Sequence, residues 1–322
     1  LDDDTFEEMS QLYPELGPLR DVRRLLGELR AFALPVGADG RNRSMLSPFG
    51  TVTGRNAPSS NRTAFGLPKW LRGLVKPRPG TAVAYIDYAQ QEFGIAAALS
   101  GDRAMKRAYE SGDPYLAFAT MAGGVPESAT KDTHPEAREL YKQCLLGVQY
   151  GMEARGLASR IGRSCAHAEH LLRQHRLVFP DYWRWSDAAV DHAFLASSIT
   201  SAFGWTMRVP PEANPRTIRN FPMQANGAEI LRLAIILAQQ AGVAVCAPVH
   251  DALLVEAPVE EIDAAVAKAK AAMVEASKVV LDGFALHVES KIVRYPDRFV
   301  DPRGAKTWER VTRIIASLEA TA

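Results

Sequence analysis

The sequence predicts a mixed α/β fold of the α+β type, in which a long helical stretch separates a first strand from a later pair of strands. Residues 82–86 form a short apolar run after Pro79-Gly80 and predict a buried strand. Residues 243–249 and 253–256 are apolar segments on either side of a two-residue turn, which predicts a second pair of strands. Between these regions, residues 91–197 carry mainly helical patterns.

Length and composition narrow the class of protein. A chain of 322 residues is typical of about two domains, and 47% hydrophobic residues are enough for a core of ordinary size. This composition excludes a disordered tail, a fibrous chain and a small disulfide scaffold. A formal charge of +1 argues against binding of nucleic acid by bulk charge, although local basic surfaces stay possible.

The cellular setting is predicted from cysteines and from the chain start. The three cysteines are an odd number without metal-ligand spacing, which indicates free thiols in a reducing compartment. The sequence contains no apolar run of eighteen residues, and its first residues are acidic, unlike a signal peptide. We therefore expect a cytoplasmic protein without a membrane partner. Because the chain starts with Leu1, we also expect it to be part of a longer protein.

The N-terminal region pairs a helix with a strongly basic stretch. Residues 18–33 show leucines at helical spacing, and Pro35 and Gly37 end this helix. Residues 17–80 carry an excess of nine positive charges. This excess indicates either a solvated basic face or a surface that binds the phosphates of a nucleic-acid backbone. The bases are Arg20, Arg23, Arg24, Arg30, Arg41, Arg43, Arg55, Arg62, Lys69, Arg72, Lys76 and Arg78.

The remaining elements follow in order. Ser164 is a suitable N-cap for the next predicted helix, and Gly204 lies in a possible hairpin over 200–209. Further on we predict helices over 225–241 and 259–277, a last strand over 286–293 and a tail helix over 307–319. The apolar face of the tail helix either docks on the body of the protein or serves as a partner surface.

Three separated groups of residues are candidates for a catalytic or binding role. Asp87 stands at the end of the predicted strand, where a capping role is the simpler interpretation. Arg138, Lys142, Leu146 and Tyr150 repeat every four residues and so share one slowly turning stripe of a helix. The pair His250-Asp251 lies at the predicted tight turn, where burial requires hydrogen bonds or a metal.

The order and spacing of these groups resemble family A DNA polymerases, the bacterial DNA polymerase I group. The segment 87–92 resembles motif A, Arg138 to Gly151 resembles motif B, and His250-Asp251 resembles motif C. Thr53-Gly54-Arg55, Phe203-Gly204 and the Asn-x-Pro-x-Gln segment at 220–224 match further family motifs. The resemblance extends from about residue 10 to 300.

This resemblance implies a polymerase palm, with its antiparallel sheet, and an inserted helical fingers domain. Residues 1–92 would hold the N-terminal helix and the first part of the palm, 93–243 the fingers, 244–300 the second part of the palm, and 301–322 the tail helix. We expect the family's thumb and exonuclease domains to be absent from these 322 residues. A protein partner or a missing N-terminal region would then compensate for the thumb.

The resemblance also implies roles for individual residues in nucleotidyl transfer with two Mg²⁺, for which Mn²⁺ can substitute. It assigns catalysis to Asp87, Asp251 and Lys142, and metal binding to Asp87, Asp251 and the backbone carbonyl of Tyr88. It assigns dNTP binding to Arg138, Lys142, Leu146, Tyr150, Glu92 and Gln90, with Glu92 excluding a 2′-hydroxyl. It assigns primer-template DNA contacts to Arg55, Asn220, Gln224 and His250.

Several positions depart from the family pattern. Ala252 stands where motif C has a glutamate, and Leu146 stands where the family has an aromatic residue. Gly94 and Tyr115 replace an arginine and a histidine. We expect a DNA-templated DNA polymerase, distributive and without proofreading. The alternatives are a polymerase-derived nucleic-acid-binding module with weak or lost catalysis, and a single-subunit RNA polymerase or reverse transcriptase.

Overall fold

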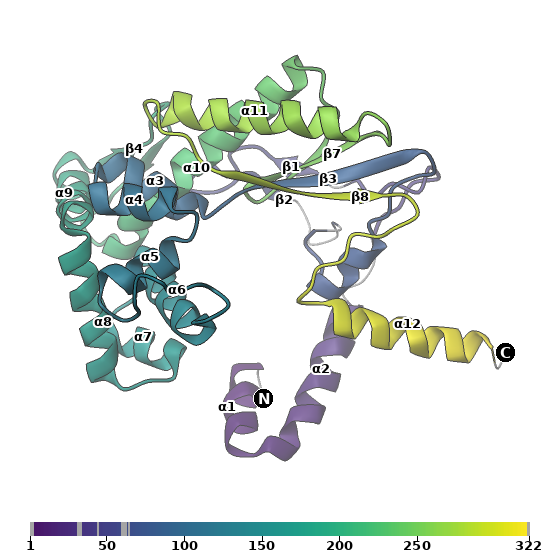
Figure 1. Ribbon diagram of the computed structural model, residues 1–322, viewed down its shortest axis with the longest axis horizontal. Helices are drawn as coiled ribbons and strands as arrows, with labels where there is room; N and C mark the ends of the chain where they lie inside the picture. The colour runs from purple at the N-terminus through teal and green to yellow at the C-terminus, as the bar shows by residue number, and fades with distance from the viewer. Residues whose placement is uncertain (1–2, 31–33, 44, 59–62, 64, 321–322) are drawn as a thin grey trace.

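The central element is a four-stranded antiparallel sheet built from three distant parts of the chain (Figure 1). In this computed structural model, which describes residues 3–30, 34–43, 45–58, 63 and 65–320, the strand order is β6-β7-β3-β8. The strands are β3 (Thr81–Tyr88), β6 (Val245–Val249), β7 (Ala252–Pro258) and β8 (Val288–Arg294). The predicted central strand and the predicted pair around residues 250 and 251 are confirmed.

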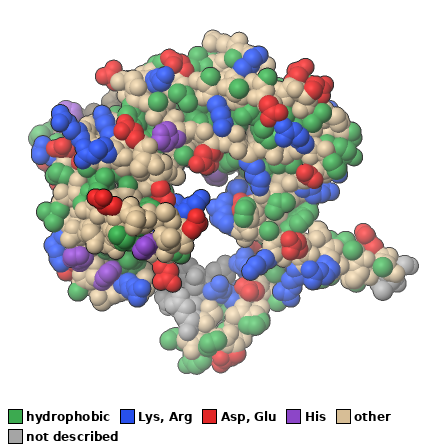
Figure 2. Space-filling model, viewed as in Figure 1, with side chains coloured by type: hydrophobic (Ala, Val, Ile, Leu, Met, Phe, Trp, Pro, Cys, Tyr) green, Lys and Arg blue, Asp and Glu red, His purple; other side chains and the backbone are tan. Residues whose placement is uncertain are grey.

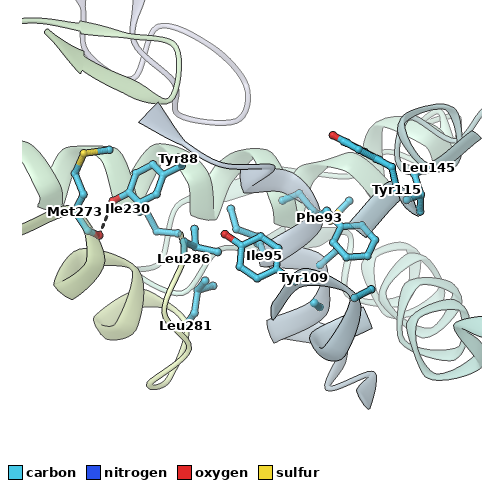
Figure 3. Close-up of a cluster of buried hydrophobic side chains, with 14 of the residues drawn as sticks. Tyr88, Phe93, Ile95, Tyr109, Tyr115, Leu145, Ile230, Met273, Leu281 and Leu286 are labelled. Carbon is cyan, nitrogen blue, oxygen red and sulfur yellow. Dashed lines mark hydrogen bonds between the residues drawn. The ribbon is translucent and has the colours of Figure 1, made fainter. Parts of the chain in front are cut away.

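One face of the sheet is buried against helices. Ala82, Ala84, Ile86 and Tyr88 alternate along β3 and point to this face, which α10 (Pro215–Gln240) and α11 (Ile262–Val280) cover. The small alanines let the helices approach closely, and the Tyr88 hydroxyl donates to the Met273 carbonyl oxygen at 2.6 Å (Figure 3). Because the Tyr88 side chain is anchored in this core, strand β3 is held rigidly at the end that carries Asp87.

The opposite face of the sheet is covered only in part. Val83, Leu254, Val293 and Phe299 form a separate apolar cluster with Phe65 beside it. These residues lie toward the start of β3, whereas Asp87 lies near its other end on the same face. The covered region therefore ends before the acidic end of the sheet begins.

A group of helices is inserted between β3 and the pair β6–β7, on the left of Figure 1. These helices are α3 (Gln91–Ser100), α4 (Arg103–Glu110), α5 (Pro114–Met121), α6 (Pro135–Gln149), α7 (Ala154–Ile161), α8 (Cys165–Val178) and α9 (Pro180–Ala196). Ser164 caps α8 as predicted, by accepting from the His167 backbone N–H. The group is locked to α9 by Asp102, whose buried carboxylate accepts backbone N–H bonds from both α4 and α9.

Helix α10 is longer than the sequence pattern predicts. It begins at Pro215 rather than near 225, because Asn214 caps it by accepting from the Arg216 backbone N–H. Pro222 lies inside the helix, and its carbonyl accepts from the Asn226 side chain at 2.7 Å. The predicted hairpin precedes this helix as β4 (Ser198–Thr200) and β5 (Thr206–Arg208).

The chain ends lie below the sheet in Figure 1. The N-terminal part consists of α1 (Asp3–Leu12), η1 (Pro14–Leu16), α2 (Gly17–Arg30), β1 (Leu46–Ser47), β2 (Ala57–Pro58) and η2 (Lys69–Leu74). Tail helix α12 (Ala305–Glu319) docks only by its first half: Trp308 packs over Gly73, whereas Ile314, Ile315 and Leu318 are exposed. Of the two alternatives for this apolar face, docking on the body therefore holds for the first half, and the second half is left exposed.

Two further expectations concern cysteines and membranes. All three cysteines are free thiols, with Cys144 buried and Cys165 and Cys246 exposed. None of the helices in the described part of the chain has the length and apolarity that a transmembrane crossing needs.

Candidate active site

Two aspartates meet at one end of the sheet. Asp87 pairs in register with Ala252 of β7, and Asp251 occupies the turn that precedes it, after His250 in a left-handed conformation with φ of 57°. Burial, followed by the charge of Asp251, raises the pKa of Asp87 to about 7. Burial likewise raises the pKa of Asp251. Burial of two neighbouring carboxylates thus raises both pKa values, and Asp251 raises that of Asp87 further.

The donor set fits a hard divalent cation. Oδ1 of Asp87 is enclosed and has no hydrogen-bond partner, although buried carboxylate oxygens normally have one. Paired carboxylates with an unused oxygen suit Mg²⁺, which also takes ligands from substrate phosphates and water. Among the residues that the structure describes, no group of three His, Cys, Asp or Glu side chains forms a complete cage. The site therefore fits a metal that takes its remaining ligands from outside the chain.

A basic and an aromatic side chain converge on Glu92 beside this pair. Arg55 Nη2 lies 3.4 Å from Glu92 Oε1, and the positive charge of Arg55 also acts on Asp251. Burial, followed by the nearby Glu92 carboxylate, raises the pKa of the Tyr150 phenol. Three segments that are far apart in sequence thus lie around the two aspartates: the loop at 55, the start of α3 and the end of α6.

The stripe on α6 is present and its polar residues are already paired. Arg138 Nε donates to Asp113 Oδ2 at 2.5 Å, and the Arg138 guanidinium lies 5.3 Å from the centre of the Tyr115 ring. Lys142 Nζ lies 3.3 Å from Glu139 Oε2, and Leu146 is half-buried. A single Asp113 contact at Nε leaves the two terminal nitrogens of Arg138 available for an anion.

A cavity of about 1000 Å³ opens next to the aspartates, on the same face of the sheet. Arg55 and His250 line it, and so do Gly227 and Leu231 of α10. Asn220, Gln224, Gly227 and Leu231 follow one another at intervals of four, three and four residues, so they lie along one side of α10. Asn220 and Gln224 are half-buried. Of the four residues predicted to contact DNA, Arg55 and His250 line the cavity, whereas Asn220 and Gln224 lie on the part of α10 that precedes its lining residues.

The basic stretch divides between this cavity and the body of the protein. Six basic and two acidic side chains line the cavity; the bases are Arg41, Arg43, Arg55, Lys76, Arg78 and Arg232. Figure 2 shows the hollow at the centre of the molecule, with blue side chains along its rim. Arg72, by contrast, forms an ion pair with Asp301 and does not line the cavity. Arg62 lies outside the described residues.

At two predicted site residues, Tyr88 and Gln90, the side-chain direction or the backbone conformation differs from that of a regular strand leading into the site. The Tyr88 side chain points into the core, so only its backbone faces the acidic end of the sheet. Gln90 adopts a left-handed conformation with φ of 45° immediately before α3, and its side-chain oxygen is buried without a partner. This strained turn rotates the chain so that Glu92 can face Arg55.

Sequence reasoning missed three contributors to the site. Glu289 of β8 lies opposite Asp87 in register, Asp113 holds Arg138, and Arg232 donates to the Gly54 carbonyl at 2.9 Å. The strand containing Glu289 was predictable, but its alignment with Asp87 depends on strand order and register. Asp113 carries a weak signal, because an Asp-Pro pair at a helix start indicates an N-cap rather than an ion pair.

The departures from the family pattern have structural consequences. A β-carbon on Gly94 would lie 2.5 Å from Leu286 Cδ2 and 2.9 Å from the Tyr109 ring, so no larger residue fits without movement. Tyr115 is buried and serves as a platform for Arg138. Ala252 is fully buried beside Asp87 and adds no polar atom to the site.

Comparison with a solved structure identifies the fold. The POL domain of Pol1 from M. smegmatis, in complex with DNA primer-template and dNTP, matches with a TM-score of 0.76 and 25% identity. The match covers 91% of this chain and 55% of that chain. The fold is therefore that of a polymerase domain, and the mixed helix and antiparallel-sheet prediction is confirmed.

Sequence comparison identifies the family. The family model for DNA polymerase family A matches residues 39–294, and the chain belongs to this family. Thermostable DNA polymerase I of Thermus thermophilus is 28% identical over 258 residues, which are 74% of this chain and 30% of that protein. DNA polymerase I of Chloroflexus aurantiacus is 28% identical over 289 residues, 81% of this chain and 30% of that protein. The chain thus spans about a third of the length of these relatives.

Proposed function

We propose that the chain catalyses the template-directed addition of deoxynucleotides to a primer 3′ end. The observation that carries this proposal is the convergence of Asp87 and Asp251 with Arg55, Glu92 and Tyr150 from separate segments. Its further support is membership of DNA polymerase family A and a similar structure whose title names DNA primer-template and dNTP.

In this proposal the chain's own residues bind and orient the substrates. Asp87 and Asp251 would hold two divalent ions, which would activate the 3′-hydroxyl and neutralise the pyrophosphate. Arg138 and Lys142 would bind the triphosphate, and Lys142 could protonate the leaving pyrophosphate. Tyr150, 42% exposed, would pack at the templating base, and Glu92 would exclude a 2′-hydroxyl.

Primer extension with Mg²⁺ and dNTPs tests this function on gapped, nicked and primed DNA. We expect the native protein to extend the primer. Asp87→Ala should abolish extension and leave DNA binding intact, because Asp87 takes part in the chemical step and not in DNA affinity. The absence of extension by the native protein, with either Mg²⁺ or Mn²⁺ and across salt concentrations, would contradict the proposal.

A second candidate is a nucleic-acid-binding module that has lost catalysis. Ala252 and the half-buried Leu146 favour it, because they remove a carboxylate and an aromatic surface from the site. The same Asp87→Ala variant separates the two functions. In a pure binding module the substitution would leave every measurable property of the DNA complex unchanged.

For this chain acting alone we propose distributive synthesis without proofreading. The support is that the family match lies within residues 39–294, which hold the four-stranded sheet, the helices that cover it and the inserted helices. Extension in the presence of excess trap DNA tests the mode of synthesis. Products longer than one or two additions per binding event would contradict it.

A further inference from the structure

The row of side chains across the acidic end of the sheet is asymmetric. Asp87 of β3 is directly opposite Ala252 of β7 on one side and Glu289 of β8 on the other. Directly opposed residues of antiparallel strands point to the same face, with β-carbons about 5 Å apart. Ala252, Asp87 and Glu289 therefore form one row on the face that carries Asp251 and the cavity.

The Glu289 carboxylate is free to interact with a ligand at this end of the sheet. It is exposed, and in the described part of the chain no ion pair or side-chain hydrogen bond is found for it. The nearest base on the same face of its strand, Lys291, is held elsewhere: its Nζ donates to the Val300 carbonyl and lies 5.1 Å from the Phe299 ring centre. The negative charge of Glu289 therefore acts on Asp87 without being neutralised.

We propose that Glu289 is the third carboxylate of the metal site and replaces, from the opposite neighbouring strand, the carboxylate that Ala252 does not provide. Because no three acidic side chains of the described residues form a complete cage, we place Glu289 outside the direct ligands. Its carboxylate accepts hydrogen bonds from metal-bound water, which Mg²⁺ retains in protein sites. This inference rests on the proposed function of Asp87 and Asp251.

The test is binding of Mn²⁺, measured by electron paramagnetic resonance on the full chain with a dideoxy-terminated primer-template and the matching dNTP. The dideoxy terminus prevents turnover, so binding is read without activity. We expect Glu289→Gln to weaken Mn²⁺ binding about tenfold, the size typical of an outer-sphere partner. The half-saturating Mg²⁺ concentration for extension of a normal primer should rise by a similar factor.

Glu260→Gln is the matched control. Glu260 is also an exposed glutamate, in the turn that follows β7 at the far end of the sheet, and its substitution removes the same charge. This variant should bind Mn²⁺ like the native protein. A second variant, Ala252→Glu combined with Glu289→Gln, should recover binding if position 252 can supply the missing carboxylate.

The outcomes separate this inference from the proposed function. If Asp87→Asn abolishes Mn²⁺ binding while Glu289→Gln binds as tightly as the native protein, the role of Glu289 is overturned and the metal site stands. If Asp87→Asn leaves binding unchanged, the proposed function itself fails. Equal weakening by Glu289→Gln and Glu260→Gln would reduce the effect to net charge and also overturn the inference.

Discussion

The carboxylate of Asp87 opposes folding of the metal-free protein at alkaline pH. Its pKa is raised from 3.8 to about 7, so the folded state binds more protons than the unfolded state between these values. Stability therefore falls as pH rises through this window. At pH 8 without metal, Asp87→Asn should be more stable than the native protein by roughly 2 kcal/mol, a figure reduced from the full shift because the group is partly exposed.

Thermal unfolding followed by circular dichroism in EDTA measures this difference. At pH 4 the stabilisation should shrink, and saturating Mg²⁺ at pH 8 should stabilise the native protein more than the variant. Asp282→Asn, at an exposed position, is the control and should change little. A variant that is no more stable than the native protein at pH 8 would contradict the raised pKa of Asp87.

Glu92 offers a test of whether shape or charge selects the sugar. Glu92→Ala removes both the side chain and the Arg55 partner, and we expect discrimination between dATP and ATP to fall at least about tenfold, or 1.4 kcal/mol. Glu92→Gln keeps the size and loses only the charge, so its discrimination should be retained. Single-nucleotide insertion gives kcat/KM for both substrates. Equal loss in the two variants would contradict a steric role.

At the scale of residues, sequence predicts what local pattern encodes. Asp87 and Asp251 stand at a strand end and in a tight turn, and both positions follow from short-range hydrophobic patterns. The proximity of Glu289 to Asp87 and of Asp113 to Arg138 could not be predicted in this way, because each pair joins separate elements of the fold. Their contacts depend on register and helix packing, which no local pattern specifies.

The hairpin β4–β5 is an element whose position depends on one buried acid of α10. Glu229 accepts from the Ser201 hydroxyl and from the Phe203 backbone N–H, and Trp205 of the hairpin donates to the Val52 carbonyl beside Gly54. Glu229→Ala should remove about 2–3 kcal/mol of local stability, because hydrogen bonds to a charged group are lost.

Hydrogen exchange of residues 198–208 should therefore accelerate in Glu229→Ala, and affinity for primer-template should fall as the loop carrying Arg55 loses its support. Glu275→Ala, on the exposed side of α11, is the control and should leave both properties unchanged. Unaltered exchange in the hairpin would show that Glu229 is not needed to hold it and that other contacts, such as the Ala202 N–H bond to Asn226 Oδ1, are sufficient.

The beginning of α10 shows why element boundaries are harder to predict than element types. Pro222 interrupts the helical pattern in the sequence and favours a start after it. In the structure the helix passes through Pro222, because Asn214 and Pro215 form a strong start in the preceding turns. The early start places Asn220 and Gln224 on the helix stripe that leads to the cavity.

At the scale of the whole molecule, local patterns predict the order of the elements but not how they assemble. The strands, the helical insertion and the hairpin follow from periodicity, and the family resemblance supplied the sheet topology. The partial docking of α12 could not be predicted, because Trp308 and Ile314 share one apolar face in the sequence. Only the position of η2, with Trp70 and Leu71, decides which half of that face is covered.

The net charge of +1 conceals a basic cavity, and this separation predicts salt-dependent DNA binding. Each neutralised phosphate contributes about 0.9 to the slope of log K against log salt concentration. Lys76 and Arg78 line the cavity, and Arg41 keeps Glu256 paired at 2.6 Å when Arg78 is removed. Lys76→Gln with Arg78→Gln should therefore lower the slope by about 2 without leaving a buried acid unpaired.

Fluorescence anisotropy of a labelled primer-template across a sodium chloride series measures this slope. Lys268→Gln with Lys278→Gln removes the same charge from α11, which covers the other face of the sheet, and this control should keep the native slope. If both double variants lower the slope equally, long-range charge rather than the cavity attracts DNA. If neither does, DNA follows a different surface, since a cavity lined by six bases and two acids cannot bind a polyanion without releasing counterions.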